Sequence, residues 1–443
     1  MKVQLNHLLI FFTLSLIFLS GCQAGVKDPL LTPTALQTST PFVEKPTLES
    51  TPLMTSTPIS TTATPQPTRE YTASAPATCV SVPIVPALPE QMDKLVPSIS
   101  SEDWSYGPQT ARVVFYEYSD FQCPYCAKLA PILKKLQAAY PEKIKVVYRH
   151  LPLTTIHDKA TLAAQAAEAA GLQNNFWQMH DLLFSKQPEW SNLSIEDFKT
   201  WLHSQAVTLK LDASKFSSDM TLESTALIVS SAGESAQTMG ITSTPFLFIN
   251  KFPYQNRNDL ETLIGVVEYF LLSDHSFSSC PEMTIDQNKQ YTATIKTEKG
   301  DIVLELYPKQ APMAVNNFVF LVKQKWLDNS TFFRVIPGFL VQAGDPTGSG
   351  LASPGFHFTN EVTPELRFNK AGVVGMANSG EGTNGSQFFI TTAPNSEFDG
   401  KYTIFAQVTE GLDVLESLRP RNPQLDMILL PADPLLSITI EEK

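Results

Sequence analysis

Two cysteines, Cys123 and Cys126, stand three residues apart where a strand pattern changes into a helix pattern. Residues 111–120, "ARVVFYEYSD", are rich in β-branched and aromatic residues and predict a buried strand. The following "CPYCAKLAPILKKLQAAY" has apolar residues at helical spacing, and Pro124 suits a first helical turn, where its missing N–H costs nothing. The sequence therefore predicts a strand-to-helix corner that exposes the first sulfur at the start of the helix.

This corner has a chemical consequence for the two thiols. A helix N-terminus carries partial positive charge and free N–H groups, so a thiolate at Cys123 is stabilised there and its pKa falls. Cys126, one turn later, can attack a mixed disulfide formed at Cys123. Tyr125 adds no positive charge and Asp120 is negative, which argues for a less stabilised thiolate. A purely structural disulfide is the alternative interpretation of this pair.

The segments after this corner predict one α/β domain over residues 97–280. "KIKVVYRHLPL" is a second strand, an Ala-rich helical stretch continues to residue 235, residues 244–250 form a further strand, and a helix closes the block. A strand, then C-x-x-C opening a helix, then more strands and helices is the thioredoxin pattern. "CPYC", the helical insertion and "TSTPF" together resemble the DsbA-like branch of the thioredoxin superfamily.

The DsbA-like resemblance implies roles for three further residues. Pro245 corresponds to a cis-proline that sits against the active cysteines, and Thr244 offers its backbone to a substrate strand. Glu117, six residues before Cys123, corresponds to a buried acid that relays a proton to Cys126. The alternative for Glu117 is an ordinary solvated or paired carboxylate on the strand.

Residues 286–443 predict a second domain of a different class. Residues 291–307 alternate around a Lys299–Gly300 turn and predict a hairpin. An amphipathic helix follows with Pro312 in its first turn, then short strands separated by Gly- and Pro-rich loops, and a second helix near residues 411–419. Many short strands with two helices predict a closed β-barrel capped by these helices.

Two stretches of this second domain carry a sharper signal. "FFRVIPGFLVQAGDPTGSG" and "GMANSGEGTNGSQFFIT", together with "FDGKYTIFAQV", closely resemble the cyclophilin family of peptidyl-prolyl isomerases. Rotation about a peptide bond faces a barrier of roughly 18–20 kcal/mol. Catalysis needs an apolar slot for the proline ring and a hydrogen-bond donor aimed at the prolyl nitrogen, and no metal or other cofactor.

The cyclophilin resemblance assigns the parts of this site. Arg334 is the donor, Gln342 holds the arginine, and the backbone of Asn378 binds the peptide. Two positions depart from the family, because Glu397 replaces a common tryptophan and Tyr402 a common histidine, and the loss of the tryptophan predicts weak cyclosporin binding. The substrate-contacting residues implied by the resemblance are Phe339, Leu340, Ala377, Gln387, Phe389 and Phe398.

The N-terminal residues predict export. Lys2 precedes the apolar run Leu8–Leu19, which has the length of a signal-peptide core and is short for a membrane span. "SGC" resembles the bacterial lipobox, which implies cleavage after residue 21 and lipidation of Cys22; an ordinary signal peptide is the alternative. Residues 29–76 hold 27 Thr, Pro and Ser residues among 48, so residues 22–96 predict a disordered tether. The expected location is extracytoplasmic, on a bacterial membrane.

The remaining cysteines predict a second disulfide, and the net charge and the histidines argue against nucleic-acid and metal binding. If Cys22 is lipidated, four cysteines remain, and they can pair in three ways. If Cys123 pairs locally with Cys126, then Cys79 and Cys280 remain. We expect these two to form a structural disulfide that closes the 97–280 domain. A net charge of −12 and the absence of long basic runs argue against nucleic acid as a partner. The histidines show no metal-ligand spacing.

Both predicted domains act on slow steps of protein folding. We therefore expect a lipid-anchored folding catalyst that combines prolyl isomerisation with thiol–disulfide exchange, whose partners are exported polypeptides and a redox protein. The alternative is a surface peptide-binding protein in which the thioredoxin-like domain is only a scaffold. Acceleration of prolyl isomerisation, rather than binding alone, distinguishes the two.

Overall fold

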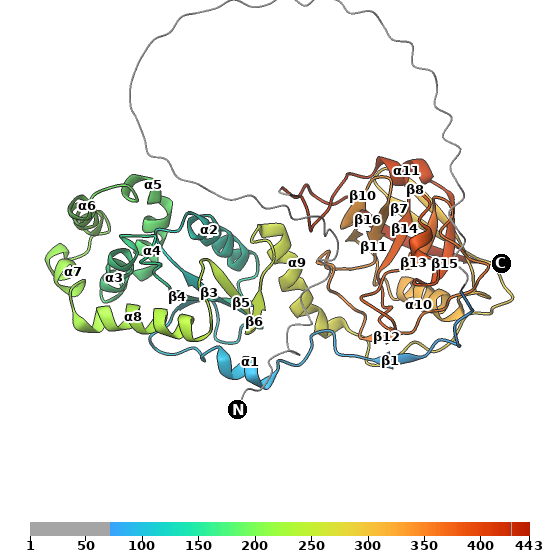
Figure 1. The fold of residues 1–443 in the computed structure, drawn as a ribbon, viewed down its shortest axis with the longest axis horizontal. Coiled ribbons are helices and arrows are strands. Elements are labelled where there is room, and N and C mark those ends of the chain that lie inside the picture. Colours follow the sequence, from blue (N-terminus) through green and yellow to red (C-terminus); the bar gives the residue numbers. More distant parts are fainter. Residues whose placement is uncertain (1–70, 427) are drawn as a thin grey trace, which may run out of the picture. The chain divides into compact units, whose positions relative to one another are not determined.

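The computed structural model describes residues 71–443 except Met427 (Figure 1). The predicted signal peptide (residues 1–21), the lipidation site Cys22 and the tether up to residue 70 lie outside the described residues.

The prediction of a disordered tether is wrong from residue 71 onward. Strand β1 (Cys79–Ser81) pairs antiparallel with β12 (Phe356–Phe358), and helix α1 spans Glu90–Leu95. The physical reason is a change in composition, because the Thr/Pro/Ser-rich stretch ends near Pro76 and apolar residues follow. Ile84, for example, is buried in the core of the C-terminal domain.

The thioredoxin-like domain is built on a five-stranded sheet in the order β2-β4-β3-β5-β6. The central strands β3 and β4 run parallel, and the other neighbours in the sheet are antiparallel. Parallel neighbours require a crossover, which α2 provides. The strands are β2 (Trp104–Tyr106), β3 (Val113–Ser119), β4 (Ile144–His150), β5 (Phe246–Ile249) and β6 (Phe252–Tyr254).

Helices cover this sheet in two groups. Helices α2 (Pro124–Ala139) and α9 (Leu260–Leu271) bury Leu133, Val267 and their neighbours against β3, β4 and β5. A helical insertion between β4 and β5 forms the helical cluster in the green part of Figure 1. Its apolar core, which includes Trp190 and Phe198, is continuous with Phe121, Cys126 and Tyr148 of the sheet and the cysteine corner. Its helices are α3 (Ala160–Gly171), α4 (Phe176–Ser185), α5 (Gln187–Trp190), α6 (Ile195–Thr208), α7 (Ala213–Asp219) and α8 (Glu223–Thr238).

The C-terminal domain contains a nine-stranded antiparallel sheet among the described residues, in the order β10-β11-β14-β13-β15-β8-β7-β16-β9. Only residues 332 and 333 separate β9 from β10, so the sheet must curl until its two edge strands approach each other. The strands are β7 (Tyr291–Thr297), β8 (Gly300–Leu306), β9 (Ser330–Thr331), β10 (Arg334–Ile336), β11 (Leu340–Ala343), β13 (Val373–Met376), β14 (Phe388–Thr391), β15 (Ile404–Glu410) and β16 (Pro434–Glu442).

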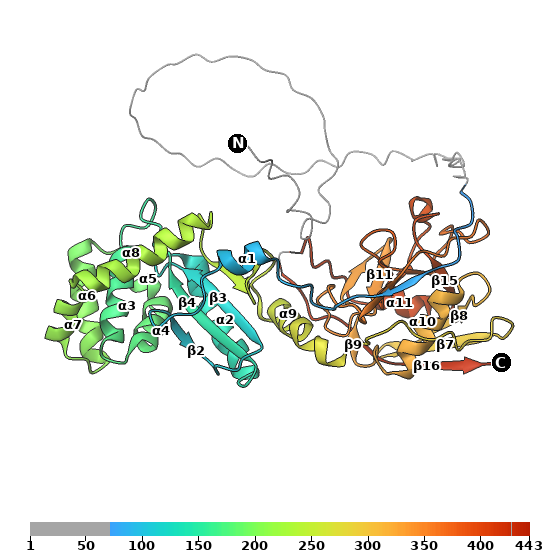
Figure 2. The same cartoon turned by 90° about the horizontal axis from the view of Figure 1, so that it is seen from below.

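The sequence predicted a closed barrel, and what the structure describes is this curled sheet. Helices α10 (Pro312–Lys323) and α11 (Leu412–Ser417) lie at opposite ends of it (Figure 1), and Figure 2 gives the perpendicular view. Alternate residues of β7, such as Ala293 and Ile295, point into the core, as expected for a strand with one buried face. The predicted hairpin is present, with Thr297 opposite Gly300.

A disulfide joins Cys79 to Cys280, with an S–S distance of 2.06 Å and a Cα–Cα distance of 6.1 Å. Its place differs from the expectation that it closes the 97–280 domain. Cys79 lies on β1, opposite Phe358 of β12, and packs against the core of the C-terminal domain. The bond therefore anchors the segment before the thioredoxin-like domain to the domain that follows it.

Candidate functional sites

The two thiols lie where the strand-to-helix corner was predicted. Cys123 is the N-cap of α2, Pro124 is the first residue of that helix, and Cys126 lies one turn on. The prediction of an exposed first sulfur is wrong, because Cys123 is 4 % exposed and Cys126 is fully buried. Cys123 is covered in part by the loop before β5, because its Sγ lies 3.4 Å from the Thr244 carbonyl oxygen.

The environment separates the pKa values of the two thiols. The pKa of Cys123 is lowered to about 5, first by a hydrogen bond from Cys126 and further by hydrogen bonds from the backbone N–H groups of Tyr125 and Cys126. The pKa of Cys126 is raised well above its ordinary value, chiefly by burial. At neutral pH the pair therefore holds its negative charge on Cys123, the residue at the helix end.

The two residues before β5 form the wall facing the cysteines. The Thr244–Pro245 peptide bond is cis, the isomer that the DsbA-like resemblance implies. A cis X-Pro bond turns the chain sharply. The carbonyl oxygen of Thr244, the residue before this proline, lies 3.4 Å from Cys123 Sγ.

Glu117 is a buried carboxylic acid on β3, in the middle of the sheet. It is 2 % exposed, and among the described residues its Oε1 has no hydrogen-bond partner. Burial raises the pKa of Glu117 to about 7, so near neutral pH it can both accept and release a proton. Tyr148, its neighbour on β4, has a phenol pKa raised by burial and then by the charges of Glu117 and Cys126, which indicates that all three groups share one buried region.

Asp120 does not act on Cys123 as the sequence suggested. Its carboxylate is buried and accepts hydrogen bonds from the backbone N–H groups of Gln122 (2.7 Å) and Leu153 (2.8 Å). The Nδ1 of His157 lies 2.8 Å from the same carboxylate. These partners compensate its charge, so the argument for a weakly stabilised thiolate loses its basis.

Gln187 is a residue of this site that sequence reasoning missed. It is a buried side chain on α5, and its Nε2 donates to the carbonyl oxygens of Phe121 (2.7 Å) and Cys123 (3.0 Å). It thereby ties the helical insertion to the corner that holds the thiols. The sequence could not predict this role, because it does not show which part of the fold a short helix with one glutamine packs against.

Antiparallel pairing brings together the residues of the predicted isomerase site in the C-terminal domain. Arg334 on β10 lies opposite Gln342 on β11, which in turn lies opposite Phe389 on β14. Arg334 Nη1 donates to Gln342 Oε1 at 3.4 Å, and Gln342 Nε2 donates to Gln387 Oε1 at 3.0 Å. Burial lowers the pKa of Arg334 from its ordinary value, and its Nε is buried without a partner among the described residues. A positively charged donor with unused hydrogen-bonding capacity is thus fixed at the edge of the sheet.

An aromatic slot lies beside this arginine. Phe398 is the centre of the cluster, with ring centroids 5.5 Å from Phe339, 5.3 Å from Phe389 and 5.1 Å from Tyr402. Leu340 is buried in the same cluster, and Ala377 packs against it. Except for Tyr402, these are substrate-contacting side chains that the cyclophilin resemblance implies.

Asparagines hold the remaining edge of the site. Asn378 Nδ2 donates to Asn384 Oδ1 (3.0 Å) and to Asn360 Oδ1 (3.3 Å), which fixes the side chain and the loop after β13. The N–H of Ala377 donates to the carbonyl of Gln387 at 2.9 Å. The backbone of Asn378 is therefore held at a defined position beside the slot.

The two departures from the family occupy different environments. Tyr402 belongs to the slot, where it packs edge-on against Phe389 and Phe398. Glu397 lies in the 3₁₀ turn Ser396–Phe398 and is exposed. Tyr402 is thus part of the aromatic lining of the slot. At position 397, an exposed charged side chain stands where many family members have an apolar ring.

Comparison with known proteins agrees with this geometry. The family "Cyclophilin type peptidyl-prolyl cis-trans isomerase/CLD" matches residues 292–439, and the family "Thioredoxin" matches residues 100–269. Peptidyl-prolyl cis-trans isomerase B of Streptomyces anulatus is 40 % identical over 172 residues, which cover 34 % of this chain and 95 % of that protein. Peptidyl-prolyl cis-trans isomerase-like 1 of Gibberella zeae is 45 % identical over 127 residues, which cover 28 % and 78 %.

The geometry of the C-terminal domain and these matches define the family of the protein. The chain belongs to the cyclophilin-type peptidyl-prolyl cis-trans isomerase family and carries an additional thioredoxin-like domain. A crystal structure of a Cryptosporidium parvum cyclophilin type isomerase is 34 % identical and covers 34 % of this chain and 98 % of its own, with a TM-score of 0.32.

Within residues 71–443, Met427 aside, no group of three His, Cys, Asp or Glu side chains is placed to hold a metal ion. In the same part of the chain, no helix has both the length and the apolar character needed to cross a bilayer.

Proposed function

We propose that this isomerase is an extracytoplasmic folding catalyst whose thioredoxin-like domain exchanges disulfides with client polypeptides. The observation that supports the thiol chemistry best is the opposite displacement of two neighbouring pKa values, down to about 5 for Cys123 and upward for Cys126. A structural disulfide needs no such asymmetry, whereas a nucleophile with a resolving partner does.

The isomerase step follows from the arginine and the slot. The client's proline ring enters the cluster around Phe398, and Asn378 binds the peptide through its backbone. As the peptide bond twists, the prolyl nitrogen becomes a hydrogen-bond acceptor, and Arg334 donates to it. Because this bond is stronger in the twisted state than in the planar one, the barrier falls. A hundred-thousandfold acceleration corresponds to about 7 kcal/mol.

The redox step starts from the oxidised pair. A client thiolate attacks Cys123 Sγ, the Cys123–Cys126 bond breaks, and Cys126 leaves as a thiolate that Glu117 protonates. A second client thiolate then attacks the client sulfur of the mixed disulfide and releases Cys123 as a thiolate. The client loses two electrons and gains a disulfide, and the pair is reduced. The low pKa of Cys123 makes it a good leaving group, which favours this direction.

Location at a bacterial membrane through a lipidated Cys22 is part of the same proposal. It is supported by the apolar run Leu8–Leu19 and the "SGC" that follows it. The disulfide between Cys79 and Cys280 also supports it, because such bonds persist in oxidising compartments.

The test is capture of clients through a single thiol. Cys126→Ser lacks the resolving sulfur and should accumulate mixed disulfides with reduced, unfolded polypeptides, seen as reductant-sensitive adducts. Cys123→Ser is the matched control and should form few. Equal, low capture by both variants would favour the alternative, in which the thioredoxin-like domain is a scaffold for a prolyl-peptide-binding protein.

A further inference from the structure

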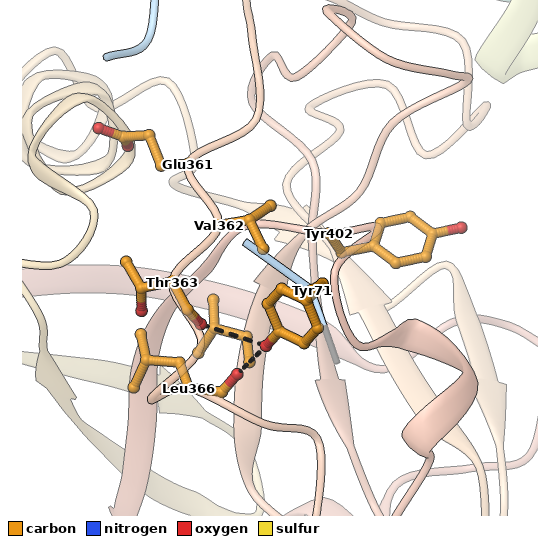
Figure 3. Close-up of a pocket in the computed structure, with 7 residues that line it drawn as sticks. Tyr71, Glu361, Val362, Thr363, Leu366 and Tyr402 are labelled. Atoms are coloured by element: carbon orange, nitrogen blue, oxygen red, sulfur yellow. Dashed lines mark hydrogen bonds between the residues drawn. The ribbon is translucent and has the colours of Figure 1, made fainter. Parts of the chain in front are cut away.

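Tyr71, the first described residue, is seated against the C-terminal domain (Figure 3). Its hydroxyl lies 2.5 Å from the carbonyl oxygen of Leu366 and 3.1 Å from that of Thr363, and its one proton is shared between these two acceptors. The guanidinium of Arg367 lies 4.3 Å from the centroid of its ring, a cation–π contact. Burial raises the pKa of the Tyr71 phenol, so it keeps the proton that these hydrogen bonds need.

The segment that carries Tyr71 is fixed along its length. We call residues 71–82 the strap. Ser74 exchanges hydrogen bonds with Val362, from backbone N–H to carbonyl (2.9 Å) and from Val362 N–H to Ser74 Oγ (3.0 Å). Strand β1 pairs with β12, and the disulfide anchors Cys79. The strap lies outside residues 292–439, the part that matches the cyclophilin family.

From Tyr71, contacts lead to the proline slot in two steps. The side chain of Arg367, under the Tyr71 ring, lies 3.7 Å from the carboxylate of Asp399, the residue that follows Phe398. A Cβ placed on Gly400 would lie 3.0 Å from Tyr71 Cγ, so the Tyr71 ring fills the space beside that glycine.

The segment that Tyr71 supports carries the wall of the slot. Residues 398–402 include both Phe398 and Tyr402. Tyr402 and Tyr71 both line one small pocket of the C-terminal domain (Figure 3). On the other side Asp399 accepts a hydrogen bond from the N–H of Phe368 (2.8 Å), whose ring stacks on Phe389. The segment is thus held between the slot and the strap.

We propose that Tyr71 is a positioning residue of the isomerase site, through which the strap holds the Phe398 wall of the proline slot. Without its ring, Gly400 faces an empty space and Arg367 loses its aromatic partner, so residues 398–402 move away from the slot. Arg334 lies on β10, and its hydrogen bond to Gln342 on β11 does not involve the strap. The proline ring should therefore bind less well while the donor that acts on the prolyl nitrogen stays in place.

The test separates KM from kcat for a prolyl tetrapeptide, using the full chain. Because contacts to the proline ring are made in both the planar and the twisted state, their loss raises KM and leaves kcat nearly unchanged. Tyr71→Ala should raise KM about three- to tenfold with kcat within about twofold. Tyr71→Phe keeps the ring, so its KM should stay close to that of the wild type. Val80→Ala changes an exposed strap position, and its KM and kcat should both match those of the wild type.

Two results would overturn the proposal. One is an unchanged KM in Tyr71→Ala. The other is a lowered kcat at unchanged KM together with a lower melting temperature, because a purely stabilising strap would reduce the folded fraction without changing the affinity of the slot.

Discussion

The pKa of Cys123 gives a prediction that can be worked through quantitatively. An ordinary cysteine with a pKa of about 8.5 is about 3 % thiolate at pH 7 and about 0.03 % at pH 5. Cys123, with its pKa lowered to about 5, is half thiolate at pH 5. The gain in thiolate at pH 5 is therefore roughly a thousandfold.

Part of this gain is offset by weaker nucleophilicity. With a Brønsted coefficient of about 0.4–0.5, a thiolate whose pKa is about 3.5 units lower reacts about 40-fold more slowly. At pH 7 the two effects nearly cancel, and at pH 5 Cys123 should react on the order of 40-fold faster than an ordinary thiol. The assay is alkylation by iodoacetamide between pH 4 and 9 on the reduced protein, with the Cys123 peptide followed by mass spectrometry.

The substitution that tests the cause is Cys126→Ala. The first cause of the low pKa is the hydrogen bond from Cys126, so its removal should move the alkylation midpoint upward by about one unit or more. Cys126→Ser keeps an O–H donor and should stay closer to the wild type. A wild-type midpoint above pH 8, or equal midpoints in all three proteins, would refute the reasoning.

Three further predictions concern the C-terminal domain. Arg334→Ala should lower kcat/KM for a prolyl tetrapeptide by about a hundredfold with an unchanged circular dichroism spectrum; activity near that of the wild type would remove the arginine from the mechanism. Cyclosporin should inhibit the chain weakly and Glu397→Trp should tighten inhibition, whereas nanomolar inhibition of the unchanged protein would contradict the role given to position 397. Cys79→Ser with Cys280→Ser should lower the free energy of unfolding of this domain by up to about 5 kcal/mol, from the chain entropy of the loop of roughly 200 residues; no change in a denaturant titration would show that the bond stabilises nothing.

Local patterns in the sequence were sufficient for the two domain types. The period-2 alternation in β7 and β8 and the change from strand to helix at Cys123 are local signals, and the structure has the hairpin and the corner where they predict them. The "CPYC" and "GSQFFIT" stretches added specificity that periodicity alone does not provide.

Long-range placement could not be predicted in this way. The composition of the tether gave no sign that residues 71–82 would pair with a strand almost 280 residues later, because pairing between distant segments leaves no local pattern. The location of the disulfide was misjudged for the same reason. The effect of Asp120 was misjudged because its carboxylate accepts hydrogen bonds from residues as far away as Leu153, and His157 lies 37 residues away. Gln187 was missed because one polar side chain in a helix carries no information about its partner.

The reduction potential of the Cys123–Cys126 pair, measured by equilibration with glutathione, tests the proposed folding catalyst most directly. Thioredoxin, with a nucleophile pKa of about 7, has a potential of about −270 mV, and DsbA, with a pKa of about 3.5, has about −120 mV. The lowered pKa of Cys123, about 5, places the expected value between these two potentials. A value in this range supports a donor or isomerase of disulfides. A value below about −270 mV would contradict the account and leave a prolyl isomerase joined to a reductase or to a stable structural bridge.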